Sequence, residues 1–259
     1  MVSLETNVAS VSLPSVEIFS SAQYMTAAAT HRGCVRAHNE DAYLVLPERP
    51  LWAVADGMGG HEAGDIASQL LISMLADSLP SPSFAASADH LEDIVAMAHD
   101  KIRDYAAREC QGRPAGTTLV LFMVNEADVG LVLWAGDSRL YRLRDGHLDV
   151  LTRDHSKFNE MVDRGVLTEQ AVAQHKDRHV ITRAVGANAS IFLDCALVDV
   201  CPADTFLLCS DGLYDSLDEV KLASLLNEGS SVKSRVDRLM DCALKAGARD
   251  NITAVVLSV

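Results

Sequence analysis

Three aspartates far apart in the sequence stand at the ends of short apolar segments, and each segment is typical of a buried strand. The pairs are LWAVA with Asp56, TFLLC with Asp211, and ITAVVL with Asp250. Carboxylates placed in this way meet only if the fold brings the strand ends together. Two unit charges about 4 Å apart repel by about 4 kcal/mol at an effective dielectric of about 20. A convergent cluster therefore requires a cation, and oxygen ligands suit Mg²⁺ or Mn²⁺.

The composition argues against several classes of protein. The chain has 259 residues, of which 49% are hydrophobic, and it contains no apolar stretch of about 18 residues that would cross a membrane. Its net charge of −14 argues against nucleic acid or an anionic membrane as a partner. No basic segment followed by an apolar run marks a secretory signal. Six cysteines form no CxxC pair, which favours reduced thiols and a cytoplasmic location.

The pattern of apolar residues predicts strands and helices but no repeat. Strands are expected within residues 16–33 and at 42–46, 51–55, 117–124, 128–136, 138–146, 192–200, 205–210 and 253–259. Short turns at 125–127 and 136–137 favour antiparallel hairpins. Amphipathic helices are expected at 65–75, 91–105 and 232–243, the last ended by Gly247. This pattern fits sheet layers covered by helices.

No long linker divides the chain, so we expect one domain over residues 22–259. Residues 1–21 are expected to form an arm or an edge strand. Residues 154–190 are polar, charged and rich in histidine, and they lie between strands. Long insertions of this kind in compact domains are often functional lids.

Arg36, Glu40 and Asp41 form one candidate constellation in the sequence RAHNED. Adjacent carboxylates on a strand point to opposite sides, so one of them can face a metal while the other orients a water molecule or a neighbour. The guanidinium of Arg36 offers paired donors to a phosphate. A solvated charged turn explains the same six residues, because such turns are common.

Gly57, directly after Asp56, allows the backbone to approach a ligand closely, and its carbonyl is a candidate ligand. A glycine-rich turn with a capping aspartate is the alternative. Asp137 lies in the short turn 136–137, where a hairpin position is favoured over a role as an outer carboxylate for a further metal.

The motifs together resemble the metal-dependent type 2C protein phosphatases, the Ser/Thr phosphatases of the PPM superfamily, and in particular their compact bacterial branch. The matching segments are VRAHNEDA (35–42), VADGMGGHEAGD (54–65), AGTTLV (115–120), AGDSRLYRLRDG (135–146), TRDHS (152–156), TRAVG (182–186), LLCSDGLYD (207–215) and ARDNITAVV (248–256). They span nearly all of the chain from about residue 22 onward, in a fixed order. The resemblance implies an α+β fold, a four-layer α-β-β-α sandwich with two central antiparallel sheets.

The resemblance also implies a site with two metals, Mn²⁺ or Mg²⁺, and a weaker third. Asp56 would bridge the two metals and Asp41 would lie close by. The remaining roles would be Asp211 and Asp250 on one metal, Glu40 and the Gly57 carbonyl on the other, Asp137 with Asp211 on the third, Arg36 on the substrate phosphate, and residues 154–190 as the flap. One departure is Met58, which stands where many eukaryotic members have a histidine that is a proposed general acid. His61 lies three residues further on, so the general acid stays unassigned.

The implied reaction is hydrolysis of phosphoserine and phosphothreonine by a water or hydroxide that bridges two metals. The expected partners are phosphorylated proteins and a bacterial Ser/Thr kinase that the enzyme opposes, and a monomer is expected. Two alternatives stay open. A binding module of the same fold would sense a phosphoprotein without catalysis, although every metal carboxylate is present. A hydrolase of a small phosphoester or nucleotide would use the same metals, because a fold does not fix the substrate.

Overall fold

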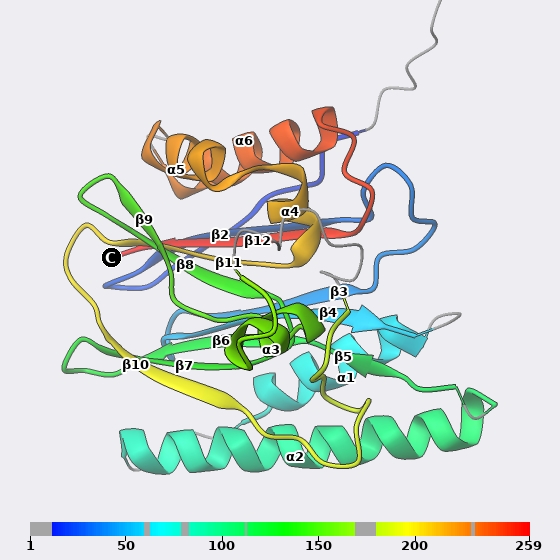
Figure 1. Ribbon diagram of the computed structural model, residues 1–259. Helices are drawn as coiled ribbons and strands as arrows, with labels where there is room; N and C mark the ends of the chain where they lie inside the picture. The colour runs from blue at the N-terminus through cyan, green and yellow to red at the C-terminus, as the bar shows by residue number, and fades with distance from the viewer. Residues whose placement is uncertain (1–11, 60–62, 79–82, 112, 169–179, 229–230) are drawn as a thin grey trace, which may run out of the picture.

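The computed structural model describes residues 12–59, 63–78, 83–111, 113–168, 180–228 and 231–259 (Figure 1). Two antiparallel sheets form its centre. The first has the order β1-β2-β12-β11-β8-β9, formed by Glu17–Ser20, Met25–His31, Ile252–Ser258, Thr205–Cys209, Arg139–Arg144 and His147–Val150. The second has the order β10-β7-β6-β4-β3, formed by Asp194–Asp199, Val129–Ala135, Leu119–Val124, Leu51–Met58 and Asp41–Leu46, and β5 (Gly116–Thr117) pairs with β4.

Helices cover the outer face of each sheet (Figure 1). Helices α1 (Ala63–Ala76) and α2 (Phe84–Glu109) pack on the second sheet. Helices α4 (Asp211–Ser216), α5 (Glu219–Glu228) and α6 (Val232–Lys245) pack on the first. The short α3 (Lys157–Asp163) lies in the polar insertion. The four-layer α-β-β-α sandwich expected from the sequence is therefore confirmed.

The side-chain period of the strands explains why both faces of the second sheet are buried. Along β4, Trp52 and Val54 point into the space between the sheets, whereas Leu51, Ala53 and Ala55 face the layer of α1 and α2. Successive residues of a strand point to opposite faces, so a continuous apolar segment serves two cores. This double burial fixes the register that leaves Asp56 near the end of β4.

Aromatic rings fill the space between the two sheets. Tyr24 meets Trp52 edge-on at 5.1 Å between ring centroids, and Trp52 lies 6.0 Å from Phe122. Phe122 lies 4.6 Å from Phe206, which belongs to the opposite sheet. All four side chains are almost fully buried. Pairs in this distance range add about 0.5–1.5 kcal/mol beyond their buried area, so the interior holds the two sheets in a fixed relation.

Local signals set the ends of α6. The Ser231 hydroxyl accepts a hydrogen bond from the Ser234 N–H at 3.2 Å, which satisfies a backbone donor at the helix start. Gly247 follows the last turn with φ of +83°, the left-handed conformation that commonly ends a helix. The glycine stop expected from the sequence is present.

Two turns expected to be hairpins have different outcomes. The turn at 125–127 joins the antiparallel pair β6 and β7, as predicted. The hairpin predicted at 136–137 is wrong, because β7 and β8 belong to different sheets and the chain crosses between the sheets there. Gly136 has φ of +106°, and a Cβ at this position would lie 2.6 Å from Thr118 Cγ2. The crossing places Asp137 at the junction of the sheets.

Residues 16–33 form two paired strands, β1 and β2, in place of the one strand expected there. Strand β1 is an edge strand, and residues 1–11 of the expected arm lie outside the described residues. The expected flap at 154–190 begins with α3, and its residues 169–179 are likewise outside the described ranges.

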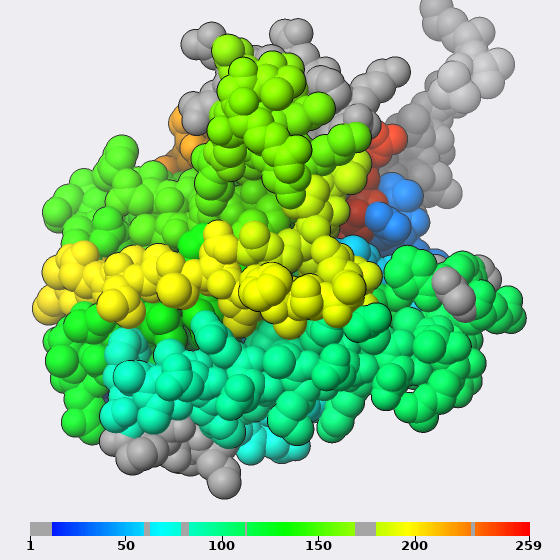
Figure 2. Space-filling view, turned by 60° about the horizontal axis from the view of Figure 1, so that its bottom comes forward, coloured from blue at the N-terminus to red at the C-terminus, as the bar shows by residue number. Residues whose placement is uncertain are grey.

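The end of the expected flap runs along α2, where Figure 2 shows the yellow segment beside the blue-green helix. Gly186 N–H donates to His99 Nδ1 at 2.9 Å, and Arg103 donates to the Ala189 carbonyl at 3.0 Å.

Candidate active site

Asp41 and Asp56 are brought together by neighbouring strands. They are direct partners in the antiparallel ladder of β3 and β4. Asp41 is 6% exposed, and its Oδ2 accepts hydrogen bonds from the hydroxyls of Ser210 at 2.7 Å and Thr253 at 2.6 Å. Ser210 follows β11 and Thr253 lies in β12, both in the other sheet. Asp41 therefore joins the two sheets at this edge.

Asp211 and Asp250 reach the same edge from the first sheet. Asp211 is the first residue of α4, just after β11, and Asp250 comes just before β12. Because β11 and β12 are antiparallel, the end of one strand lies beside the start of the other. A Cβ at Gly212 would lie only 1.9 Å from the Asn251 carbonyl oxygen, so the two turns touch and position 212 requires glycine.

The aspartates at this edge influence one another. Burial raises the pKa of Asp56 well above its usual value, and the charges of Asp41, Asp211 and Asp137 raise it further. Burial and the charges of Asp137 and Asp250 raise the pKa of Asp211 in the same way. Burial raises the pKa of Asp41 to about 6, although its two hydroxyl donors act in the opposite direction. The fold thus brings Asp56, Asp211 and Asp250 together at one edge of the two sheets.

Several oxygens in this cluster have no partner. Asp41 Oδ1, Asp137 Oδ1 and Asp211 Oδ1 are buried without a hydrogen-bond donor. Within the described residues, Arg36 with Asp250 is the only ion pair that a lysine or arginine makes to the cluster. Among the described residues, no group of three or more Asp, Glu, His or Cys side chains is placed so that it could hold a metal ion without rearrangement. The carboxylates therefore lie at one edge of the sheets but are farther apart than the ligands of a bound metal. Their hard oxygen donors are of the kind that Mg²⁺ or Mn²⁺ prefers.

Glu40 and Gly57 border the cluster. The Glu40 N–H donates to Asn251 Oδ1 at 2.8 Å, and the Glu40 carbonyl accepts from the Gly57 N–H at 3.1 Å and from the Ser68 hydroxyl at 2.6 Å. Burial raises the pKa of the Glu40 carboxyl. A Cβ at position 57 would lie 2.1 Å from the Gly64 carbonyl oxygen, so the close approach of β4 and α1 requires glycine.

Arg36 lies beside the cluster on an exposed loop. Its Nη2 donates to Asp250 Oδ2 at 2.6 Å, with 54% of the arginine side chain and 38% of the aspartate side chain exposed. A guanidinium has five N–H donors. The contact with Asp250 therefore leaves donors available for a phosphate at the mouth of the site.

Asp137 occupies the crossing between the sheets and is 4% exposed. Burial, followed by the nearby charge of Asp154, raises its pKa to about 7. Its backbone carbonyl accepts a hydrogen bond from the Tyr214 hydroxyl at 3.0 Å, and the Tyr214 ring lies 3.8 Å below the guanidinium of Arg139. A cavity of about 340 Å³ opens beside these groups.

Several supporting residues escaped the sequence analysis. Ser210 and Thr253 hold Asp41, and the Asn251 amide donates to the carbonyls of Arg32 and His38. Thr118 accepts from the Asp56 N–H at 2.9 Å. Two of these residues could have been predicted from the sequence, because Ser210 and Asn251 each directly neighbour an aspartate of the cluster.

Met58 ends β4 and is partly buried, whereas His61 lies outside the described residues. The structure therefore assigns no general acid from this loop.

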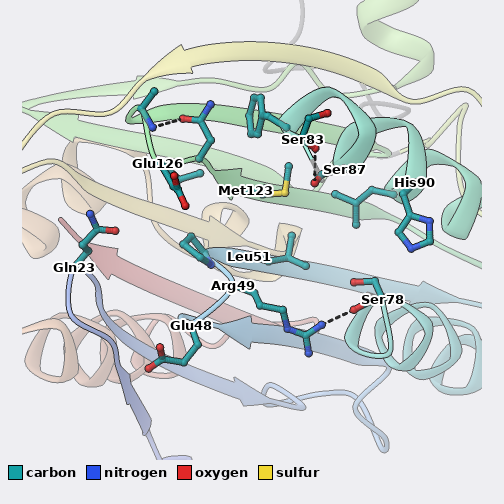
Figure 3. Close-up of a pocket in the computed structure, with 16 residues that line it drawn as sticks. Gln23, Glu48, Arg49, Leu51, Ser78, Ser83, Ser87, His90, Met123 and Glu126 are labelled. Atoms are coloured by element: carbon teal, nitrogen blue, oxygen red, sulfur yellow. Dashed lines mark hydrogen bonds between the residues drawn. The ribbon is translucent and has the colours of Figure 1, made fainter. Parts of the chain in front are cut away.

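A larger cavity of about 620 Å³ lies away from the carboxylates (Figure 3). Glu48 and Arg49 reach it from the loop between β3 and β4 (Figure 3). Ser78 lines it from just after α1, Ser83 from the N-cap of α2, and His90 from α2 itself. That loop is at the opposite end of β3 and β4 from Asp41 and Asp56. Size alone would select this cavity, but the perturbed titratable groups select the other end of the sandwich.

Comparisons with known proteins agree with this geometry. A family model described as protein phosphatase 2C matches residues 30–256. The serine/threonine phosphatase stp of Listeria monocytogenes is 32% identical over 235 residues, which cover 88% of this chain and 93% of that protein.

Solved structures show the same fold. PppA of Pseudomonas aeruginosa, described as a key regulatory component of T6SS, superposes with a TM-score of 0.83 at 40% identity and covers 92% of this chain and 98% of its own. The catalytic domain of the serine/threonine protein phosphatase PstP, in complex with two manganese ions, has a TM-score of 0.78 at 34% identity over 91% of this chain and 97% of its own.

The four-layer sandwich, the carboxylates at the edge of its two sheets and these relatives together identify the class of metal-dependent protein phosphatases. The chain belongs to the protein phosphatase 2C family. The family and the enzyme class expected from the sequence are confirmed. Among the described helices, none combines the length and the apolar character needed to span a bilayer.

Proposed function

We propose that the protein removes phosphate from phosphoserine and phosphothreonine in other proteins and requires two divalent cations, Mn²⁺ or Mg²⁺. One observation carries this proposal. Buried oxygens of Asp41, Asp137 and Asp211 lack a donor, and no basic side chain in the described ranges pairs with these residues. Buried carboxylates in such a state are strongly unfavourable unless a cation joins them.

The proposed roles follow the position of each group. Asp56, on which the charges of the other aspartates act, would bridge the two cations. The other ligands would be Asp211 and Asp250 for one cation, Glu40 and the Gly57 carbonyl for the other, and Asp137 with Asp211 for a weaker third. Asp41 would act through its neighbours, because one of its oxygens is already held by two hydroxyls.

Divalent cations held by these residues would lower the pKa of a bound water molecule toward neutrality and would neutralise charge on a phosphoryl group. The chain's own residues supply the rest. Arg36 retains free donors beside the carboxylate cluster and would hold two phosphoryl oxygens. The buried walls exclude water and strengthen each of these electrostatic contacts. No cysteine takes part.

The test is hydrolysis of p-nitrophenyl phosphate and of a phosphothreonine peptide, each with EDTA and with Mn²⁺. We expect turnover only with metal, and loss of at least a hundredfold in Asp56→Asn, with an unchanged circular dichroism spectrum. Thiol alkylation is expected to leave turnover of the wild type intact. Undiminished activity in Asp56→Asn would refute the assignment.

The alternatives predict different results. A phosphoprotein-binding module would bind the phosphopeptide without metal-dependent turnover. A hydrolase of small phosphoesters would prefer p-nitrophenyl phosphate or a nucleotide over the phosphopeptide by kcat/KM.

The cellular setting is proposed from the family resemblance. The protein would be cytoplasmic, monomeric, and opposed to a Ser/Thr kinase. A phosphoproteome recorded after gene deletion tests the kinase relation, and light scattering on the purified protein tests the monomer.

A further inference from the structure

Residues 31–39, HRGCVRAHN, carry two arginines and two histidines but no acidic residue, although the whole chain has a net charge of −14. A third arginine, Arg249, directly precedes Asp250. Arg32, Arg36 and Arg249, here called the basic rim, are all exposed. The basic rim therefore gathers three positive charges in the two segments that border Asp250.

Backbone contacts hold the two segments of the basic rim together. The Cys34 N–H donates to the Ala248 carbonyl at 2.8 Å, and the Asn251 amide donates to the Arg32 carbonyl at 3.1 Å. A Cβ at Gly33 would lie 2.1 Å from the Asp250 carbonyl oxygen, so the segments touch. The three arginines thus project from one rigid edge that also carries Asp250.

Two guanidiniums of the basic rim differ from every other described arginine. The side chains of Arg32 and Arg249 form no hydrogen bond and no ion pair with the described residues. The guanidinium of each remaining described arginine donates to a carboxylate, a carbonyl or a hydroxyl, except that of Arg164, which forms an ion pair with Glu160 at 3.7 Å. In a chain with an excess of carboxylates, these two cations are left free in the segments that border Asp250.

We infer that the basic rim selects phosphopeptides whose side chains next to the phosphoresidue are acidic. A peptide whose phosphate meets Arg36 passes over its neighbours at about 3.3 Å per residue, within reach of long arginine side chains. An acidic protein repels such a peptide as a whole, and the free guanidiniums offset that repulsion where the peptide binds. A nucleic acid is disfavoured, because its many phosphates would extend over the negative surface.

The inference rests on the proposed function for its substrate, and the test separates the two. We compare kcat/KM for three phosphothreonine peptides of equal length, flanked by Asp and Glu, by Ala and Ser, or by Lys and Arg. The wild type is expected to prefer the acidic over the neutral peptide by about fivefold, the size of two exposed ion pairs. The preference should shrink between low and high salt.

The double variant Arg32→Gln/Arg249→Gln is expected to abolish this preference and to leave p-nitrophenyl phosphate turnover unchanged. Arg108→Gln/Arg238→Gln is the matched control. It removes the same charge from exposed ion pairs on α2 and α6. Equal loss of preference in this control would show a bulk charge effect and overturn the inference. A wild type that treats the three peptides alike would overturn it too.

A binding measurement tests the basic rim even if no peptide is hydrolysed. Fluorescence anisotropy with labelled acidic and neutral phosphopeptides, using Asp56→Asn with Mn²⁺, should show tighter binding of the acidic one. The difference should vanish when Arg32→Gln/Arg249→Gln is added. If the acidic peptide binds more tightly but no peptide is hydrolysed, the result counts against the proposed function and not against the basic rim. Absent selectivity would count against the basic rim.

Discussion

Strand β11 has an aspartate directly before it, Asp204, and another shortly after it, Asp211, and the two are opposites in their surroundings. Asp204 is 1% exposed and accepts hydrogen bonds from Arg144 Nε at 2.7 Å, from Arg144 Nη2 at 2.6 Å and from the Cys201 N–H at 2.9 Å. At the other end, Asp211 Oδ1 is buried without a donor, and acidic neighbours raise the pKa of Asp211.

The difference separates two uses of a buried carboxylate. Asp204 has its counter-charge inside the chain, so it is a structural residue, and its removal would leave Arg144 half satisfied. Asp211 stands among Asp41, Asp56 and Asp137 and forms no ion pair with a basic side chain in the described part of the chain. The carboxylate at the start of β11 therefore has its counter-charge within the chain, whereas the carboxylate after its end requires an external cation.

The largest expected effects come from replacing Asp211 or Asp204, one at a time, with asparagine. Asp211→Asn should lower metal-dependent turnover by a hundredfold or more, without lowering the stability of the metal-free protein, because a like charge is removed. Asp204→Asn should lower the free energy of unfolding by about 3 kcal/mol, since it breaks a buried pair. Its turnover per folded molecule should stay near that of the wild type.

Urea unfolding in EDTA and phosphatase assays with Mn²⁺ measure both quantities. Leu197→Ala, at an exposed site on β10, serves as a control that should change neither. Loss of activity in Asp204→Asn at full folding, or a marked loss of metal-free stability in Asp211→Asn, would remove the distinction between the two ends.

A smaller effect is expected for Asp41→Asn. Its carboxylate accepts hydrogen bonds from the hydroxyls of Ser210 and Thr253 and so helps to position the neighbouring carboxylates of the cluster. Groups that orient metal ligands typically contribute ten- to a hundredfold in metal affinity or activity. We expect the apparent Mn²⁺ dissociation constant to rise by about tenfold, with kcat at saturating metal reduced less. Calorimetric titration with Mn²⁺ measures this, and unchanged affinity would mean that the two hydroxyl contacts serve only the fold.

The pH dependence of stability gives a third contrast. Without metal, Asp41 with a pKa of about 6 and Asp137 with a pKa of about 7 bind protons in the folded state that an unfolded aspartate has lost above about pH 4. Their contribution to stability is therefore fully present below about pH 4 and is lost as the pH rises through about 7. In EDTA, Tm should be several degrees higher at pH 5 than at pH 7.5.

Mn²⁺ added at pH 7.5 should raise Tm, because a cation replaces the protons. Asp137→Asn should flatten the pH slope in EDTA, whereas Asp204→Asn should lower Tm without flattening it. An Asp137→Asn variant with the same pH slope of Tm in EDTA as the wild type would contradict the raised pKa of Asp137.

The sequence predicts which aspartates form the cluster better than it predicts the course of the chain that brings them together. Asp56, Asp211 and Asp250 follow from apolar segments with a polar end, because such segments must be buried strands. The position of Asp137 does not follow, since Gly136-Asp137 has the composition of a hairpin and only the packing against Thr118 shows that the chain changes sheets there. The pairing of Asp204 with Arg144 also lies beyond local patterns, because their separation along the chain gives no signal.

The smallest expected effect concerns His155, which holds the crossing that carries Asp137. Its Nδ1 accepts from the Gly136 N–H at 3.0 Å, and its ring lies parallel to Trp134 with 6.2 Å between centroids. His155→Phe keeps the stacked ring but leaves that N–H unpaired, at a cost of about 1–2 kcal/mol. We expect a lower Tm and a few-fold higher Mn²⁺ requirement, with kcat nearly unchanged. His147→Phe, an exposed histidine on β9, should change neither, so an equal effect in both variants would show that His155 contributes bulk and not a contact to the cluster.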